Sequence, residues 1–296
     1  MAKIISLTGD LGSGKSTVSN LLIERLNYDY IYTGKIQREI ANKYNMTTLE
    51  LNKYAETHPE IDEEIDSTFK SLNDSTDLIV DSRLAWFFIP KSFKIFLKTN
   101  LMVSANRISN DNQRKSEKYS SKEEAVNNII ARKTSENKRY MELYGANCSD
   151  LSNFNLIIDT SFISPERVVE IILTEYNSWL VSGKCSKAFI SPANLYPTQP
   201  VYGFENNQYL KSIQNDMLIN GYNPDFPVTV ANINSFDYIL DGHKRTSCAI
   251  KNNIDLIPVV YQDSNKEEIS TSIKPDLFSE WEEFNSFKYL MYPIKK

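Results

Sequence analysis

The residues with the clearest chemical meaning form a glycine-rich run near the N-terminus. Gly9, Gly14, Lys15 and Ser16 fit the pattern G-x-x-x-x-G-K-[ST], between an apolar run at 4–8 and a helical pattern. In such a loop successive backbone N–H groups point at phosphate oxygens, while the lysine reaches the terminal phosphates and the serine holds Mg²⁺. The spacing predicts an ATP site, although a glycine-rich turn could match by chance. Its expected members are Gly9, Gly12, Ser13, Gly14, Lys15, Ser16 and Thr17.

Charged side chains elsewhere could complete this chemistry. Asp81 ends the apolar run 78–80, where a carboxylate can join the serine as a Mg²⁺ ligand, although aspartate is also a common turn residue. Arg132, Glu136 and Arg139 are spaced to share one helix face, as the residues of a solvated ion-pair face also are. Phosphoryl transfer needs such converging arginines. The metal candidates are Ser16 and Asp81, and the catalytic candidates are Lys15, Asp81, Arg132 and Arg139.

Short apolar runs alternate with helical patterns around these residues, which predicts an α/β fold with a parallel sheet and flanking helices. We expect helix 48–72 to break near Pro59, and a helix to run from Pro165 to about Trp179. The other expected strands and helices are strands 3–8, 28–32, 78–80, 93–97 and 156–158, and helices 15–26, 34–44 and within 101–144.

Composition limits the class of protein. With 296 residues the chain is long enough for two domains, and the Ser- and Gly-containing stretch 182–186 reads as a linker between domains at 1–180 and 186–296. The net charge of −5 does not favour a nucleic-acid partner, and no apolar run reaches membrane-spanning length. Three scattered cysteines suggest neither disulfides nor zinc. We expect a cytoplasmic protein without a membrane or nucleic-acid partner; the oligomeric state is left open.

The second half contains one sharp feature, a polar glycine turn between an expected strand at 237–240 and an expected helix at 246–252. Glycine, histidine and cations at a helix start favour an anion, although the turn could merely expose polar residues. We expect His243 to change charge near neutral pH and the cations to be unpaired. The tail 274–296 is expected to pack on this domain as a helix and an extended end. The candidate phosphate site is Asp241, Gly242, His243, Lys244 and Arg245.

From residue 3 to about 173 the chain resembles the archaeal-type cytidylate kinases, which are nucleoside-monophosphate kinases with a phosphate-binding loop and a lid. This resemblance implies ATP and Mg²⁺ as cofactors and small-molecule nucleotides as substrates. It implies that Arg38 and Arg83, with Thr33 and Gly34, hold the acceptor phosphate, that Glu136 contacts the acceptor sugar, and that Arg132 and Arg139 belong to the lid. The similar segments are GDLGSGKSTVSNLL, TGKIQREIANKYNMTTLELNKYAETHPEIDEEID, LIVDSRLAW, ARKTSENKRYMELYG and DLSNFNLIIDTS.

The segment from about 193 to 261 resembles the ParB/sulfiredoxin-like α+β fold, whose Gly-x-x-Arg turn binds nucleotide phosphates. The resemblance carries this role to Gly242, His243 and Arg245, and to Asp241 through a form seen in proteins that phosphorylate free serine.

Three function classes follow from these features. The first is a kinase that makes CDP or dCDP from ATP and the monophosphate. The second is a kinase with a different small-molecule acceptor, because Ser82 and Trp86 stand where the family usually has glycines. The third is a nucleotide-dependent DNA-associated or regulatory protein, which only the ParB-like resemblance supports. The first is the main hypothesis.

Overall fold

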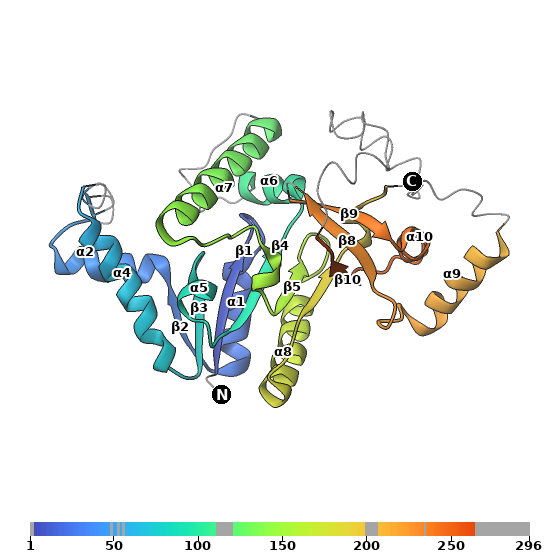
Figure 1. Cartoon of the computed structure of the whole chain (residues 1–296), viewed down its shortest axis with the longest axis horizontal. Helices are drawn as coiled ribbons and strands as arrows, with labels where there is room; N and C mark the ends of the chain where they lie inside the picture. The colour runs from blue at the N-terminus through green and yellow to red at the C-terminus, as the bar shows by residue number, and fades with distance from the viewer. Residues whose placement is uncertain are drawn as a thin grey trace. The chain divides into compact units, whose positions relative to one another are not determined.

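The computed structural model describes residues 3–47, 50–51, 54, 57–110, 121–198, 207–233 and 235–263. The chain divides into two compact units, Met1–Ser186 and Lys187–Lys296 (Figure 1). The division falls at one end of the stretch that the sequence marks as a linker.

A parallel sheet forms the centre of the first unit. Its described strands follow the order β2-β3-β1-β4-β5. Ile4, Ile5 and Leu7 of the central strand are fully buried, as expected for a parallel strand covered on both faces. The predicted α/β class with a mostly parallel sheet is confirmed here. The strands are β1 (Ile4–Gly9), β2 (Asp29–Tyr32), β3 (Leu78–Asp81), β4 (Phe93–Lys98) and β5 (Leu156–Asp159).

Helices connect these strands and carry the side chains that surround the glycine-rich loop. Two pairs pack together, α1 against α8 and α6 against α7 (Figure 1). The second pair buries Ala105 and Ile108 against Ala125 and Ile129. The helices are α1 (Lys15–Leu26), α2 (Thr33–Lys43), α4 (Pro59–Ser71), α5 (Ala85–Phe88), α6 (Leu101–Ser109), α7 (Lys122–Tyr144) and α8 (Pro165–Ser182), with single 3₁₀ turns at Leu72–Asp74 and Leu151–Asn153.

The second unit has a mixed sheet in which the described strands follow the order β6-β10-β8-β9-β7. Helix α10 packs against α9. The elements are β6 (Lys187–Ile190), a 3₁₀ turn (Pro192–Asn194), β7 (Leu195–Tyr196), α9 (Gln208–Asn220), β8 (Val228–Ile233), β9 (Phe236–Asp241), α10 (His243–Lys251) and β10 (Ile257–Tyr261).

The expected start of the last helix was wrong. Helix α10 begins at His243 rather than Thr246, because Gly242 takes a left-handed conformation with φ of 105° and reverses the chain directly after β9. His243, Lys244 and Arg245 therefore form the first helical turn. The expected helix and extended end at 274–296 lie outside the described residues. None of the helices that the structure describes combines the length and apolar character that a bilayer crossing requires.

Candidate active site

The glycine-rich loop joins β1 to α1 and is tightly seated on the sheet. A Cβ on Gly9 would lie 2.4 Å from the Leu97 carbonyl oxygen, so only glycine fits this close approach. Gly14 has φ of 80° and precedes Lys15, the first residue of α1, without a side-chain cap. The N–H groups of this helix start are thus turned toward the loop, as an anion site requires. Lys15 Nζ lies 3.3 Å from the carbonyl oxygen of Gly9, back across the loop.

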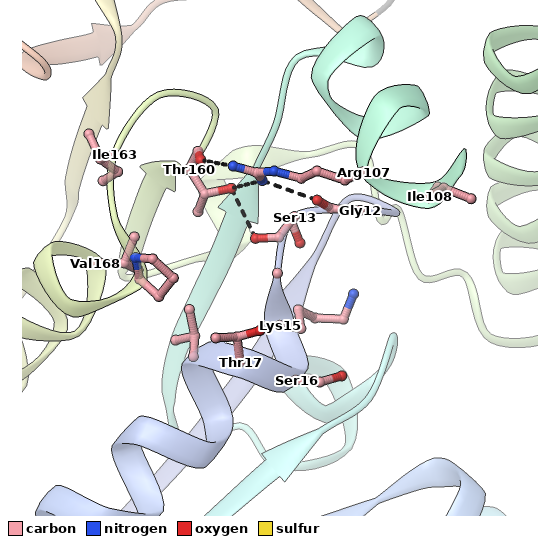
Figure 2. A pocket seen from close by; sticks show the side chains of 13 residues that line it. Gly12, Ser13, Lys15, Ser16, Thr17, Arg107, Ile108, Thr160, Ile163 and Val168 are labelled. Atoms are coloured by element: carbon pink, nitrogen blue, oxygen red, sulfur yellow. Dashed lines mark hydrogen bonds between the residues drawn. The ribbon is translucent and has the colours of Figure 1, made fainter. Parts of the chain in front are cut away.

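A pocket of about 450 Å³ opens beside the loop. Figure 2 shows the Arg107 side chain reaching from α6 to Thr160 and Gly12. Arg107 donates hydrogen bonds to the carbonyl oxygens of Gly12 at 3.1 Å and Thr160 at 2.7 Å. Burial lowers the pKa of the guanidinium. The pocket combines the glycine-rich loop with a wall that has one cationic side chain and several apolar ones. It is lined by Gly12, Ser13, Gly14, Lys15, Ser16, Thr17, Val18, Arg107, Ile108, Thr160, Ile163, Pro165 and Val168.

Asp81 lies at the carboxyl end of β3, beside the loop. Burial raises the pKa of its carboxyl, while the Lys15 ammonium opposes that rise. The Tyr30 hydroxyl donates to Asp81 Oδ2 at 3.4 Å, and burial together with that carboxylate raises the pKa of Tyr30 to about 12. Asp81 and Ser16 offer oxygen ligands, which suit Mg²⁺ in kinases because phosphates and waters supply the rest. Across the described ranges, no group of three or more histidine, cysteine or acidic side chains gathers to hold a metal.

Three of the charged candidates meet between α7 and the segment after β3. Arg83 Nε lies 3.1 Å from Glu136 Oε2, and Arg132 Nε lies 2.9 Å from Glu136 Oε1. Arg83 also donates to the Gly9 carbonyl oxygen, which ties this cluster to the glycine-rich loop. Arg139 lies nearby, with its guanidinium 5.4 Å from the ring centre of Tyr140. Burial raises the pKa of Tyr140, and the charges of Glu136, Arg139 and Arg83 all act on it.

Arg38 lies on α2 and contacts the aromatic pair formed by Tyr30 and Tyr32. Its guanidinium donates to the Tyr32 hydroxyl and lies 5.2 Å from that ring centre. Tyr32 stacks on Tyr30 at 5.3 Å, and Tyr30 bonds Asp81. Gly34 lies beside the same tyrosine, since an added Cβ would be 3.3 Å from the Tyr32 ring. Arg38 and Gly34 are therefore connected to Asp81 through the stacked rings of Tyr32 and Tyr30, and Thr33 is the first residue of α2.

Sequence reasoning missed two charged residues at this site. Arg107 belongs to no recognisable motif, and its carbonyl partners come from the loop and from a segment 53 residues away. Lys133 Nζ lies 2.7 Å from Asp10 Oδ1, an ion pair between α7 and the glycine-rich loop. Burial alone would raise the pKa of the Asp10 carboxyl, but Lys133, with Lys98 and the Thr99 N–H, lowers it by more, so the net pKa is below its ordinary value. Lys133 directly follows Arg132 in the sequence, and this adjacency is the signal that could have pointed to it.

In the second unit a separate pocket of about 540 Å³ contains the turn that sequence analysis singled out. The expectation of unpaired cations was wrong, since Arg245 lies 2.9 Å from Asp241 and Lys244 lies 5.3 Å from the ring centre of Tyr209. The pocket is lined by Tyr209, Ile213, Asp216, Met217, Tyr222, Asn223, Phe226, Asp241, Gly242, His243, Lys244 and Arg245.

The expected charge change of His243 near neutral pH was also wrong. Its side chain is 3% exposed, and burial lowers the pKa to about 4. The Thr198 N–H lies 3.0 Å from His243 Nε2 and donates to it, so this nitrogen carries no proton. His243 is thus a neutral, packed side chain at neutral pH rather than a proton carrier.

Comparison with known proteins identifies the protein family that the first unit matches. Residues 4–162 match the model of the cytidylate kinase-like family. Cytidylate kinase of Sulfolobus acidocaldarius is 38% identical over 172 residues, which cover 57% of this chain and 91% of that protein. Cytidylate kinase of Pyrococcus furiosus is 36% identical over 170 residues, covering 57% of this chain and 85% of the relative.

Solved structures with a similar backbone include two shikimate kinases. The one from Bacteroides thetaiotaomicron has a TM-score of 0.42 and 15% identity, covering 58% of this chain and 97% of that chain. The one from Aquifex aeolicus has a TM-score of 0.39 and 18% identity, covering 61% of this chain and 99% of that chain.

The family model spans more than half of the chain, and the relatives are covered over most of their length. The chain belongs to the cytidylate kinase-like family and is a nucleoside-monophosphate kinase, a transferase.

Proposed function

We propose that the chain transfers the terminal phosphoryl group of ATP to CMP or dCMP and releases ADP with CDP or dCDP. The observation that carries this proposal is the glycine-rich loop, which lines a pocket and whose Gly9 carbonyl oxygen accepts a hydrogen bond from Arg83 of the Arg83, Arg132 and Glu136 cluster. The choice of cytidine rests on relatives named cytidylate kinase, such as two that are 38% identical over 172 residues and 34% identical over 180 residues.

In this proposal ATP binds with its phosphates on Gly9, Gly12, Ser13, Gly14, Lys15, Ser16 and Thr17. Its base enters the far part of the pocket, between the Arg107 guanidinium and the apolar side chains of Ile163, Pro165 and Val168. A planar cation on one side and apolar carbons on the other suit an aromatic base. Because Arg107 is already held by the carbonyl oxygens of Gly12 and Thr160, little side-chain freedom is lost on binding.

The acceptor phosphate replaces Glu136 at Arg83 and also binds Arg38, beside Thr33 and Gly34. Glu136 then remains paired with Arg132 and is positioned to meet the acceptor sugar. Lys15, Arg132 and Arg139 neutralise the charge that develops on the transferring phosphoryl group, which is the main contribution a kinase makes to this reaction. Ser16 and Asp81 would hold Mg²⁺. The ion would supply positive charge that offsets the negative charge of the ATP phosphates.

The residues that replace family glycines do not argue for a different acceptor. Ser82 is 7% exposed and Trp86 is 5% exposed. The Trp86 indole N–H donates to the Arg83 carbonyl oxygen at 3.1 Å, and its ring packs on Phe154. Both side chains are therefore buried, and Trp86 holds the backbone of Arg83 through its indole hydrogen bond. This arrangement favours the unchanged cytidine acceptor over the altered-acceptor alternative.

The test is to incubate the full chain with ATP and Mg²⁺ and, in separate reactions, CMP, dCMP, UMP, AMP, GMP and dTMP, and to quantify diphosphates by chromatography. We expect kcat/KM for CMP and dCMP to exceed that for every other monophosphate. A higher value for another base would replace the cytidine assignment, and no product with any of them would favour a non-nucleotide acceptor.

We also propose that the second pocket binds a nucleotide or a phosphorylated small molecule at Asp241, Gly242, His243, Lys244 and Arg245. The supporting observation is that the pocket combines the start of α10 with Lys244, Arg245 and the exposed rings of Tyr209 and Phe226. Calorimetric titration of the full chain and of Arg245→Ala with ATP, ADP, CTP and CDP tests it. We expect two binding sites in the unmodified chain and one in Arg245→Ala. If the two proteins give the same isotherm with each of the four ligands, the second site is refuted.

A further inference from the structure

The Asp10–Lys133 ion pair connects two parts of the kinase unit that are 123 residues apart in sequence. Asp10 lies in the glycine-rich loop and Lys133 on α7, next to Arg132 and in the same helix as Arg139. The side chains are 14% and 32% exposed, and their charged atoms are 2.7 Å apart. An ion pair so shielded from water is held more strongly than one at the surface.

The loop end of this pair is rigid. Asp10 Oδ2 accepts the N–H of Thr99 at 3.1 Å, and the Asp10 N–H donates to the Leu97 carbonyl oxygen at 2.9 Å. One carboxylate oxygen is therefore fixed to the segment that follows β4, while the other receives the Lys133 ammonium. The ion pair thereby connects α7 directly to the ends of β1 and β4, beside the proposed phosphate site.

A second ion pair between α7 and the core, Glu136 with Arg83, is not expected to persist during turnover. Glu136 also ties α7 to the core through Arg83, but the proposed acceptor phosphate competes for that arginine. The Asp10–Lys133 pair involves no residue assigned to either nucleotide, so it can persist when both substrates are bound. It is the more suitable of the two for keeping the helix aligned at the moment of transfer.

We propose that Lys133 is a positioning residue for phosphoryl transfer, which acts through Asp10 to hold α7 so that Arg132 and Arg139 face the transferring phosphate. The inference rests on the proposed role of α7 as the lid, but not on which monophosphate is the acceptor. It predicts a loss in kcat with little change in the KM of ATP, because Lys133 orients the lid rather than binding the donor.

The experiment compares Lys133→Met, Lys133→Arg, Asp10→Asn and the double variant D10N/K133M in full-length protein. The matched control is Lys138→Met on the same helix, whose 3.8 Å pair with Glu142 is 74% and 64% exposed. Assays use whichever monophosphate the unmodified protein prefers, and hydrogen–deuterium exchange of residues 124–144 is measured without substrates.

Four results are expected together. Lys133→Met lowers kcat about tenfold and speeds exchange in α7. The double variant stays equally slow, Lys133→Arg retains most of the activity, and Lys138→Met matches the unmodified protein. Recovery of kcat in the double variant would overturn the proposal, since Lys133 would then only neutralise a harmful Asp10 charge. Unchanged exchange of α7 in Lys133→Met would overturn it as well, and this measurement does not depend on the acceptor.

Discussion

Arg83 is held on both sides before any substrate binds: its Nε lies 3.1 Å from Glu136 Oε2, and its guanidinium also donates to the Gly9 carbonyl oxygen. The first contact comes from α7 and the second from the glycine-rich loop. The acceptor phosphate is expected to take the place of the Glu136 carboxylate, so Arg83 is oriented in advance for an anion.

Replacing Arg83 or Arg38 with alanine should therefore affect the acceptor far more than ATP. We expect the acceptor KM to rise about tenfold or more, because each arginine supplies charge-assisted hydrogen bonds to its phosphate. Steady-state kinetics with each substrate varied separately will show it. The control is Arg167→Ala on α8, an arginine that is 61% exposed and paired with Glu170. An equal loss of ATP affinity in Arg83→Ala would contradict the assignment.

Lys15→Ala should abolish turnover without unfolding the protein. The change removes the ammonium that faces the terminal phosphates, and such preorganised charges commonly contribute about 10²- to 10³-fold to kcat. Coupled detection of ADP measures the loss, and a circular dichroism melt checks the fold. Wild-type turnover in this variant would show that the loop is not the catalytic ATP site.

Arg107→Ala should raise the KM of ATP about tenfold while leaving the acceptor KM nearly unchanged, because the guanidinium lines the loop pocket proposed to hold ATP. Part of the effect will come from the loop, since Arg107 also bonds the Gly12 carbonyl oxygen. Arg107→Lys distinguishes the two contributions, because lysine keeps the charge but not the flat face. Parallel losses for both substrates would argue against a role in binding the base.

His243 should remain uncharged down to about pH 5. The chain contains two histidines, so proton NMR of the imidazole signals, assigned with His243→Gln, follows each separately. The folded pKa of about 4 lies below the ordinary value of 6.5, so the unfolded chain takes up this proton first as pH falls. The corresponding stability is complete above pH 6.5 and is lost down to about pH 4.

The size of this effect can be measured. A shift of this extent corresponds to on the order of 3 kcal/mol. The free energy of unfolding of the wild type should therefore fall more steeply as the pH is lowered than that of His243→Gln. A titration midpoint for His243 above pH 6 would refute the packed, neutral state.

The features of the site that depend on neighbouring residues could be predicted from the amino-acid sequence. The glycine-rich loop between β1 and α1, Asp81 at the end of β3 and the shared face of Arg132 and Glu136 are local, because backbone conformation and helix period act over a few residues. The start of α10 was missed because a left-handed glycine such as Gly242 can begin a helix at once or extend a turn.

Which distant charges meet, and which are shielded from water, depends on how the chain folds and could not be predicted from the sequence. Arg107 reaches Thr160 across 53 positions, and Lys133 reaches Asp10 across 123. The residue types at these positions are compatible with many partners, and the sheet order and the packing of α6 on α7 select one. The charge of His243 likewise follows from burial, which arises when β7, β9 and α10 come together and exclude solvent from the imidazole.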